Sequence, residues 1–174
     1  MYSGSVILIG MPGSGKSTVG KALSKRLGID FCDTDDLIIQ STGEALQDTL
    51  DKRGRNGFLD KERRVLEAFR PDKPTVISTG GSVVLHKDIM EQYKAIGKIV
   101  FLDADLPLLR KRLWNMENRG IVLSESGSDL LSVYKEREPL YYRYSDIRVH
   151  IRRKQVNEMV EEIINMLNAD NIAK

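Results

Sequence analysis

The stretch from Gly10 to Ser17 reads GMPGSGKS and satisfies the pattern G-x-x-x-x-G-K-S/T in full. The continuous apolar run SVILI, at residues 5–9, precedes it, and GKSTVGKALSKRLG, at residues 15–28, follows it with apolar residues at helical spacing. A strand, a glycine-rich loop and a helix in this order are typical of a phosphate-binding loop, because backbone N–H groups and the helix N-terminus then face the phosphate oxygens. The stretch therefore predicts a nucleotide-binding α/β fold.

Strand and helix patterns alternate along the rest of the chain. Four more strands are expected at residues 30–33, 75–79, 98–104 and 147–151. Helices are expected over most of residues 35–69, with a break near RGRNG at 53–57, and then from about Asp105, over 129–142 and over 156–167. Because no linker composition divides the chain, we expect one α/β domain, residues 1–174, with a parallel sheet covered on both faces.

Composition narrows the class of partner. The formal net charge of +2 is too small to indicate a nucleic-acid or membrane surface, and no apolar run approaches the length that spans a bilayer. The N-terminus has no basic region and is interpreted as a strand rather than a signal peptide. The single cysteine, Cys32, excludes an intrachain disulfide and favours a reducing compartment. We expect a cytoplasmic monomer that binds small molecules and neither nucleic acid nor membrane.

Two side chains of the loop carry its chemistry. Lys16 supplies a flexible cation for the β- and γ-phosphates of a nucleotide, and Ser17 offers a hydroxyl to Mg²⁺. The loop does not decide where the phosphoryl group goes. Water, a protein, a nucleotide and a small metabolite all remain possible acceptors on this motif alone.

The segment FCDTDD, at residues 31–36, places carboxylates close to the phosphates. Asp33 ends a strand, and the carboxyl ends of parallel strands converge on the ligand crevice, so Asp33 can hold Mg²⁺ directly or through its water. Asp35 can point into the substrate space, accept a hydrogen bond from an alcohol and later take its proton. Helix capping is the structural alternative, and we prefer it for Asp36.

These motifs resemble those of the shikimate kinase family, small members of the nucleoside-monophosphate-kinase-like group of P-loop folds. The resemblance runs over nearly the whole length and includes GMPGSGKSTVG, DTD, TGG, NRG and REPLY at the family's spacing. It implies a five-stranded parallel sheet, a helical substrate-binding insert at about 34–62, a lid at about 115–127, and ATP with Mg²⁺. The implied reaction is transfer of the γ-phosphoryl group to a hydroxyl of a small metabolite. Shikimate, in aromatic amino acid biosynthesis, is the best single candidate.

The resemblance also implies roles for individual residues. Lys16, Asp35 and Arg119 are the implied catalytic residues, with Asp35 as the base and Arg119 closing over the phosphates from the lid. A cation on a glycine-containing loop can also arrive late and neutralise charge in the transition state, which supports Arg119 independently. The implied nucleotide-binding residues are Gly13, Ser14, Gly15, Lys16, Ser17, Thr18, Arg119 and Arg153, and the implied Mg²⁺ ligands are Ser17 and Asp33. The implied acceptor-binding residues are Asp35, Leu59, Gly80, Gly81 and Arg137, of which Arg137 grips the carboxylate.

Two positions depart from the family pattern. In shikimate kinases the helix after the DTD block carries phenylalanine, then arginine, then glutamate three positions on, whereas this chain has Phe58, Leu59 and Glu62. The missing arginine normally helps to bind the substrate carboxylate, and its loss would weaken binding by roughly 2–4 kcal/mol, or about 30- to 1000-fold. Ser82 replaces the third glycine of the usual GGG.

Three explanations of these departures stay open. Shikimate is still the acceptor, with Arg55, Lys61 or Arg63 supplying the missing cation. Alternatively, the pocket serves another polyol or hydroxy compound. The third explanation, a nucleotide-binding protein without catalysis, conflicts with retention of the loop, the aspartates and Arg119. A nucleotide-dependent regulatory module and a nucleoside-monophosphate kinase are alternatives from other classes, although the acidic DTD helix is poorly suited to an anionic acceptor.

Three other side chains receive no functional role. Cys32 is interpreted as a small buried apolar residue rather than a nucleophile. His86 and His150 have no partners at a metal-ligand spacing.

Overall fold

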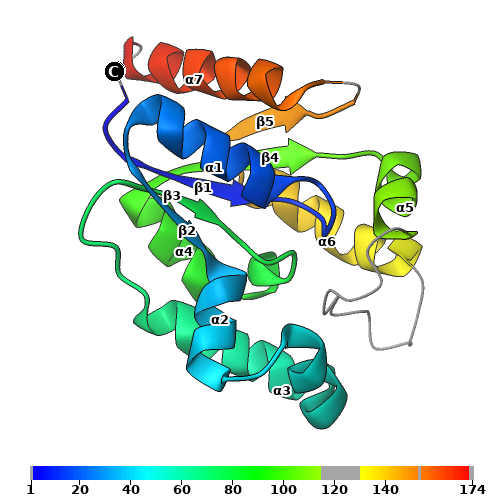
Figure 1. Cartoon of the computed structure of the whole chain (residues 1–174). Helices are drawn as coiled ribbons and strands as arrows, with labels where there is room; N and C mark the ends of the chain where they lie inside the picture. The colour runs from blue at the N-terminus through cyan, green and yellow to red at the C-terminus, as the bar shows by residue number, and fades with distance from the viewer. Residues whose placement is uncertain (1, 115–129, 153, 173–174) are drawn as a thin grey trace.

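A sheet of five parallel strands forms the centre of the molecule, as predicted (Figure 1). The computed structural model describes residues 2–114, 130–152 and 154–172. The strands lie in the order β2-β3-β1-β4-β5. They are β1 (Ser5–Ile9), β2 (Asp30–Asp33), β3 (Thr75–Ser78), β4 (Gly97–Asp103) and β5 (Ile147–His150), so each predicted strand is confirmed with nearly the predicted bounds.

The middle of the sheet is buried on both faces, which explains why its strands lack the alternation of a half-exposed strand. Every residue of β1 is buried. Ile7 pairs with Ile77 on one side and with Ile99 on the other, and all three side chains are fully buried. A strand whose two faces both meet helices needs apolar residues at successive positions, and VILI, at residues 6–9, satisfies that requirement.

Helices cover both faces of the sheet (Figure 1). α1 and α7 contact each other on one face, and α4 and α6 pack against β4 from the other. α2 and α3 extend beyond the β2 side of the sheet. The helices are α1 (Lys16–Leu27), α2 (Thr34–Thr42), α3 (Leu46–Ala68), α4 (Lys87–Ile96), α5 (Leu106–Trp114), α6 (Leu130–Tyr144) and α7 (Val156–Ile172), with a short 3₁₀ helix η1 (Val83–Leu85) before α4.

The predicted break in the first long helical region is confirmed, and the structure shows a second break in the same region. α3 is interrupted at Gly54, which has φ of 65°, inside the expected RGRNG segment. α2 ends separately at Gly43, where φ is 68°. Both values lie in the left-handed region that glycine adopts most readily.

α4 was not predicted, although its sequence carries a signal. Ile89, Met90 and Tyr93 are buried on one face at helical spacing. The predicted lid, residues 115–127, lies outside the described residues. Within the described residues, no helix has the length and apolar composition needed to cross a membrane.

Gly97 gives a direct test of the strand register. It pairs with Ser5 across β4 and β1, and a Cβ atom at Gly97 would lie 2.0 Å from the carbonyl oxygen of Ser5. Its φ of −177° is ordinary extended backbone, so alanine would be excluded by the clash alone. Gly97→Ala is expected to lower the free energy of unfolding by roughly 3 kcal/mol or more, as overpacking against a backbone that cannot move away.

Chemical denaturation measures this effect, and Gly28→Ala is the matched control. Gly28 has φ of 68°, and a Cβ atom there would meet nothing within 4 Å. The control should lose only about 1 kcal/mol, from left-handed backbone strain. Equal losses in the two variants would contradict the observed pairing of Ser5 with Gly97.

Candidate active site

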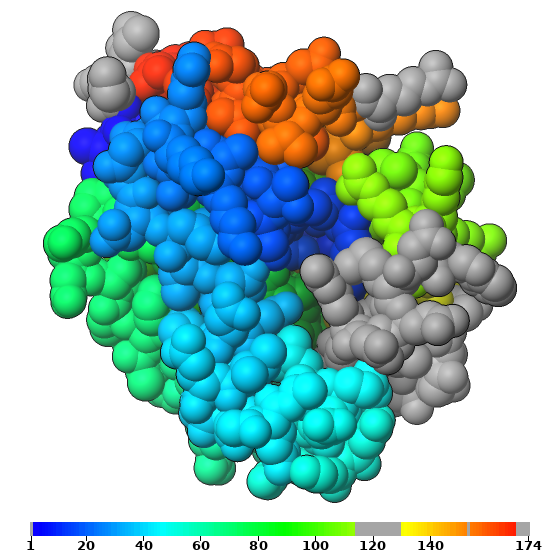
Figure 2. Space-filling view, in the orientation of Figure 1, coloured from blue at the N-terminus to red at the C-terminus, as the bar shows by residue number. Residues whose placement is uncertain are grey.

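A cavity of about 590 Å³ opens at the edge of the sheet where β1 and β3 end. Figure 2 shows the surface hollowed there, between the phosphate-binding loop with the start of α1, in blue, and the α2–α3 region, in lighter blue and cyan. The cavity walls come from that loop, α2, α3, the segment after β3, α5, α6 and the start of α7. Because the strands are parallel, the segments that follow β1, β2 and β3 all meet at this edge.

The phosphate-binding loop has a backbone that requires its glycines. Gly13 and Gly15 have φ of 80° and 95°, a region that residues with a side chain rarely adopt, and Gly15 is the N-cap of α1. Lys16 is 7% exposed, and its Nζ donates to the carbonyl oxygens of Gly10 (2.8 Å) and Met11 (2.9 Å). A helix N-terminus and a buried cation therefore meet at one point, which is what a polyphosphate group requires.

Oxygen atoms suited to a metal lie beside this loop. The Oγ of Ser17 is 3.3 Å from the Oγ of Ser78, and Ser78 pairs with Asp33 in the register of β3 and β2. Asp33 also caps α2, because its Oδ1 accepts from the backbone N–H of Asp35 at 3.1 Å. Hydroxyl and carboxylate oxygens are ligands that Mg²⁺ prefers, so these residues fit the ion. No cluster of three or more His, Cys, Asp or Glu side chains able to hold a metal occurs among the described residues.

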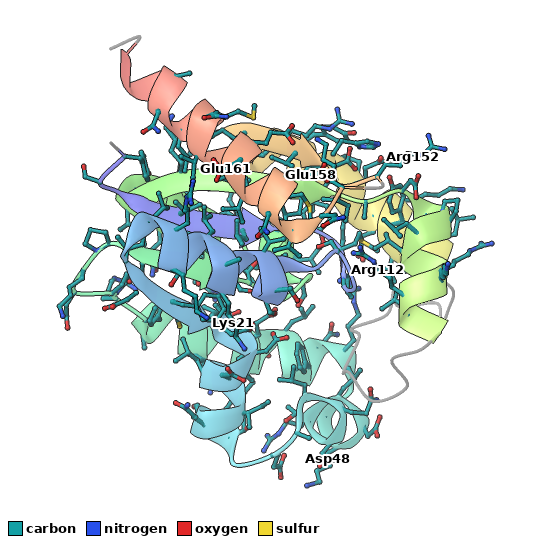
Figure 3. All side chains as sticks on the ribbon, turned by 45° about the horizontal axis from the view of Figure 1, so that its top comes forward. Lys21, Asp48, Arg112, Arg152, Glu158 and Glu161 are labelled. Atoms are coloured by element: carbon teal, nitrogen blue, oxygen red, sulfur yellow. The ribbon has the colours of Figure 1, made fainter. Side chains whose placement is uncertain are left out.

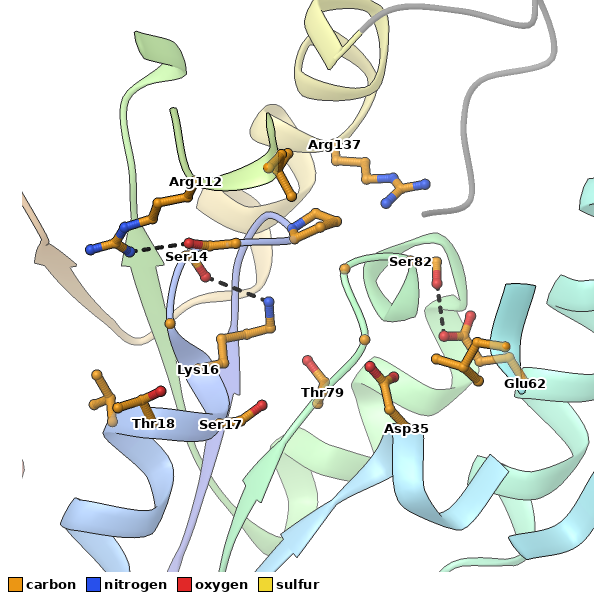
Figure 4. A pocket seen from close by; sticks show the side chains of 18 of the residues that line it. Ser14, Lys16, Ser17, Thr18, Asp35, Glu62, Thr79, Ser82, Arg112 and Arg137 are labelled. Atoms are coloured by element: carbon orange, nitrogen blue, oxygen red, sulfur yellow. Dashed lines mark hydrogen bonds between the residues drawn. The ribbon is translucent and has the colours of Figure 1, made fainter. Parts of the chain in front are cut away.

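Asp35 lines the cavity from the first turn of α2. Figure 4 shows it between Lys16 and Ser17 on one side and Glu62 on the other. The backbone of Gly80 passes close to both carboxylates, because a Cβ atom there would lie 3.1 Å from Asp35 Oδ1 and 3.0 Å from Glu62 Oε1. A hydroxyl group held by Asp35 would therefore lie next to the phosphate-binding end of the cavity.

Glu62 is a buried carboxylate with two side-chain partners. It is 1% exposed, and Ser82 Oγ lies 2.7 Å from its Oε1 while His86 Nε2 lies 2.9 Å from its Oε2. Sequence reasoning gave no role to His86 and considered Glu62 only as part of a pattern. The partners are far from Glu62 along the chain, so spacing alone could not reveal the contact.

Arg137 reaches the cavity from α6 and is held on a fixed helix. Its side chain is 1% exposed. One turn later, the hydroxyl of Tyr141 donates to the carbonyl oxygen of Gly81 at 2.6 Å, and its ring stacks on Phe101 with centroids 5.1 Å apart. These contacts tie α6 to the segment after β3 and to β4, so the position of Arg137 is set by the core.

A second arginine lies near Arg137. Arg55 Nη2 is 2.5 Å from Glu136 Oε1, and Arg137 Nε is 3.9 Å from Glu136 Oε2. The two oxygens of one carboxylate thus face two guanidinium groups. This juxtaposition brings a cation from α3 next to the residue predicted to bind the acceptor carboxylate.

The described residues that line the far end of the cavity were not predicted from the sequence. Arg112 donates from Nη1 to the carbonyl oxygen of Gly13 at 3.1 Å (Figure 3 labels Arg112 beside the loop). Leu113 joins it from α5, and Val156 and Met159 line the cavity from the start of α7. The predicted residues of this region, Arg119 and Arg153, lie outside the described residues.

Most of the predicted site residues meet in the cavity. Leu59 is half-buried on α3, and neither Leu59 nor Asp33 is among the cavity-lining residues. Asp33 pairs with Ser78 in the register of β2 and β3. The predicted residues that do line the cavity are Gly13, Ser14, Gly15, Lys16, Ser17, Thr18, Asp35, Gly80, Gly81 and Arg137. Their individual chemical roles stay predictions.

Cys32, on β2, does not supply a nucleophile. Burial, together with the nearby Asp33 and Asp36, raises the pKa of the Cys32 thiol to about 11. The thiol is therefore protonated near neutral pH, and the thiolate is the reactive form.

Comparisons with known proteins identify the family of the chain. A family model described as Shikimate kinase matches residues 12–168. The chain belongs to the shikimate kinase family. A shikimate kinase of Sulfurihydrogenibium sp. (strain YO3AOP1) is 33% identical over 163 residues, which cover 94% of this chain and 97% of that protein.

Solved structures support the same assignment. A shikimate kinase from Acinetobacter baumannii, in complex with shikimate, has a TM-score of 0.88 at 27% identity and covers 97% of this chain and 94% of that chain. A gluconokinase from Sinorhizobium meliloti 1021 has a TM-score of 0.62 at 19% identity, covers 99% of this chain and 97% of that chain, and shows the fold alone. The predicted fold class and the predicted type of enzyme, a small-molecule kinase, are confirmed by this family membership.

Proposed function

We propose that this chain transfers the γ-phosphoryl group of ATP to a hydroxyl of shikimate, giving shikimate 3-phosphate. The observation that carries the proposal is one cavity lined both by the phosphate-binding loop and by Asp35 and Arg137. A carboxylate suited to a hydroxyl and a guanidinium suited to a carboxylate are the recognition groups that a hydroxylated carboxylic acid needs. We also propose a cytoplasmic monomer, with residues 34–62 as the substrate-binding insert.

The nucleotide end rests on the phosphate-binding loop. In the proposed complex the loop backbone and Lys16 bind the β- and γ-phosphates, while the base packs toward Val156 and Met159. Ser17 and Asp33 would hold Mg²⁺, which when bound neutralises charge on the phosphates. Arg119 would act from the proposed lid at 115–127 and Arg153 near the base.

The acceptor end rests on two side chains from different helices. Asp35 orients the acceptor hydroxyl beside the phosphates and takes its proton during transfer. Arg137 holds the acceptor carboxylate from the opposite helix and so fixes which hydroxyl faces Asp35. Lys16 stabilises the charge that moves between donor and acceptor.

Arg55 is the best-supported substitute for the arginine that Leu59 replaces. Arg63 is half exposed and donates to Asp88 at 2.8 Å on α4, and Lys61 lines a separate depression between α2 and α3. Arg55, in contrast, meets the carboxylate of Glu136 beside Arg137. A shikimate carboxylate that displaced Glu136 would find two guanidinium groups.

Coupled ADP release tests the proposed reaction. Mg-ATP and shikimate are assayed beside carboxylate-free polyols, other hydroxy acids, AMP and CMP. Saturable turnover at sub-millimolar shikimate is the expected result. Turnover of another acceptor in place of shikimate would make Leu59 and Ser82 specificity determinants of a different kinase, and nucleotide binding without any product would favour a regulatory module.

Leu59→Arg tests the missing contact directly. If the acceptor end otherwise follows the family, the added guanidinium should lower the KM for shikimate by about tenfold or more, as one hydrogen bond to a charged group does. Steady-state kinetics measure the change. Asp60→Arg places the same guanidinium at the adjacent, exposed position, where the net charge changes by two units instead of one, and it should leave KM unchanged. An unchanged KM in Leu59→Arg would mean that the pocket differs from the family by more than one contact.

A further inference from the structure

The buried carboxylate of Glu62 is held at both oxygens by side chains from other segments. Ser82 lies after β3 and is 4% exposed, and His86 lies between η1 and α4 and is 8% exposed. Figure 4 shows the Ser82–Glu62 hydrogen bond at the side of the cavity where Asp35 lies. The Ser82 hydroxyl donates to Glu62 Oε1, and the His86 ring donates to Oε2 in the tautomer that carries its proton on Nε2.

Glu62 also lines the cavity, and this separates it from a carboxylate that merely stabilises the core. Its Oε1 and the Oδ1 of Asp35 approach Gly80 at nearly equal distances, 3.0 and 3.1 Å from the position of a Cβ atom there. A carboxylate has about four acceptor sites, and Ser82 and His86 each use one. With respect to the described residues, Glu62 therefore keeps capacity to accept further hydrogen bonds beside Asp35.

One of the two departures from the family pattern acts directly on this carboxylate, because Ser82 adds a hydroxyl donor to Glu62 Oε1. The other, Leu59, lies on the same helix as Glu62 and has no cationic group. The cavity then presents Asp35 and Glu62 as acceptors and Arg137 as the cation of its described acceptor end. Two carboxylates and one guanidinium favour an acceptor with several hydroxyl groups over an acceptor with a second negative charge.

We propose that Ser82 and His86 are positioning residues that hold Glu62 to accept a hydrogen bond from a second hydroxyl of the acceptor, beside the hydroxyl that Asp35 receives. This inference rests on the proposed function, because it requires a polyhydroxylated acceptor. Without its two donors, Glu62 would turn away or exclude the second hydroxyl, and acceptor affinity would fall while phosphoryl transfer stays aligned.

Variants at both positions distinguish the loss of a hydrogen bond from a change in side-chain volume. Ser82→Ala keeps the Cβ atom and removes the hydroxyl, and His86→Leu removes the ring donor. Each should raise the KM for shikimate by about tenfold or more and leave kcat and the KM for ATP within about twofold. His86→Gln keeps an N–H donor at a similar reach and should restore most of the affinity. Ser145→Ala is the control, since its hydroxyl meets the carbonyl of Tyr142.

Shikimate analogues that each lack one hydroxyl supply a readout that a purely structural role would not change. For one analogue, the increase in KM caused by the missing hydroxyl and the increase caused by Ser82→Ala should not be additive in free energy, because both changes remove the same contact. Additive losses for every analogue, or an unchanged KM in both variants, would overturn the inference. If Ser82→Ala does not fold, Ser82→Gly, which carries the residue usual in the family, replaces it.

Turnover by the wild-type protein distinguishes a failure of this inference from a failure of the proposed function. Shikimate turnover with unaffected variants leaves the function standing and removes the positioning role. If wild type phosphorylates another acceptor from the panel, the shikimate proposal fails and the variants are measured with that acceptor. No turnover with any acceptor overturns both.

Discussion

Asp35→Asn is expected to lower kcat by about a hundredfold or more and to leave the KM for ATP nearly unchanged. Asparagine has the size of aspartate and can still hydrogen-bond to a hydroxyl, but it cannot take the proton that the hydroxyl loses on transfer. The side chain lines the cavity from the first turn of α2, and it takes no part in the predicted binding of the nucleotide. The loss should therefore appear in the chemical step.

Asp36→Asn is the matched control for this experiment. Asp36 is the adjacent acid on the same helical turn, its side chain is exposed, and it is not among the cavity-lining residues. If the loss came only from removing a negative charge in the first turn of α2, kcat would fall equally in both variants. Steady-state kinetics with single-turnover measurements distinguish the two, and normal turnover by Asp35→Asn would remove Asp35 from the mechanism.

Arg137→Gln is expected to raise the KM for shikimate by about 30- to 1000-fold. The guanidinium is 1% exposed and lines the cavity, so it can neutralise an acceptor carboxylate where water cannot. Glutamine keeps hydrogen-bond donors and much of the length but not the charge. Because the Arg137 side chain points away from Lys16 and Ser17 in Figure 4, the KM for ATP should change little.

Arg143→Gln provides the control on the same helix. Arg143 is exposed and lies over the ring of Tyr144, with its guanidinium carbon 5.8 Å from the ring centroid. It should have normal kinetics and similar stability. A normal shikimate KM in Arg137→Gln would show that the acceptor carboxylate binds elsewhere, with Arg55 the first residue to replace.

The sequence was informative where function depends on residues close together along the chain. The phosphate-binding loop lies within one strand-turn-helix unit, so its pattern predicted the loop together with Lys16 and Ser17. The strands were also predictable, because a strand buried on both faces needs a continuous apolar run. The rule that parallel strands end at one edge predicted Asp33 near the phosphates, and Asp35, two residues further along the chain, was predicted to point into the substrate space.

The parts that were missed depend on contacts between distant segments. Glu62 and His86 meet only because α3 packs beside the segment after β3. Val156 and Met159 reach the cavity because β5 places α7 next to α1, and neither has a side chain that indicates nucleotide binding. α4 was not predicted, although the buried Ile89, Met90 and Tyr93 repeat at helical spacing in its sequence.

The close packing of Gly81 against Pro12 bears on how this scaffold evolves. A Cβ atom at Gly81 would lie 2.6 Å from Pro12 Cδ, so the backbone that leads to the acceptor end rests directly on the loop that binds phosphate. The spacing between donor and acceptor is then set by the Gly81 backbone packing on the Pro12 ring. With this contact in place, a change of acceptor through the proposed specificity positions 59 and 82 would leave the two ends of the cavity in the same relative position, so a new alcohol could be admitted without rebuilding the phosphate-binding loop.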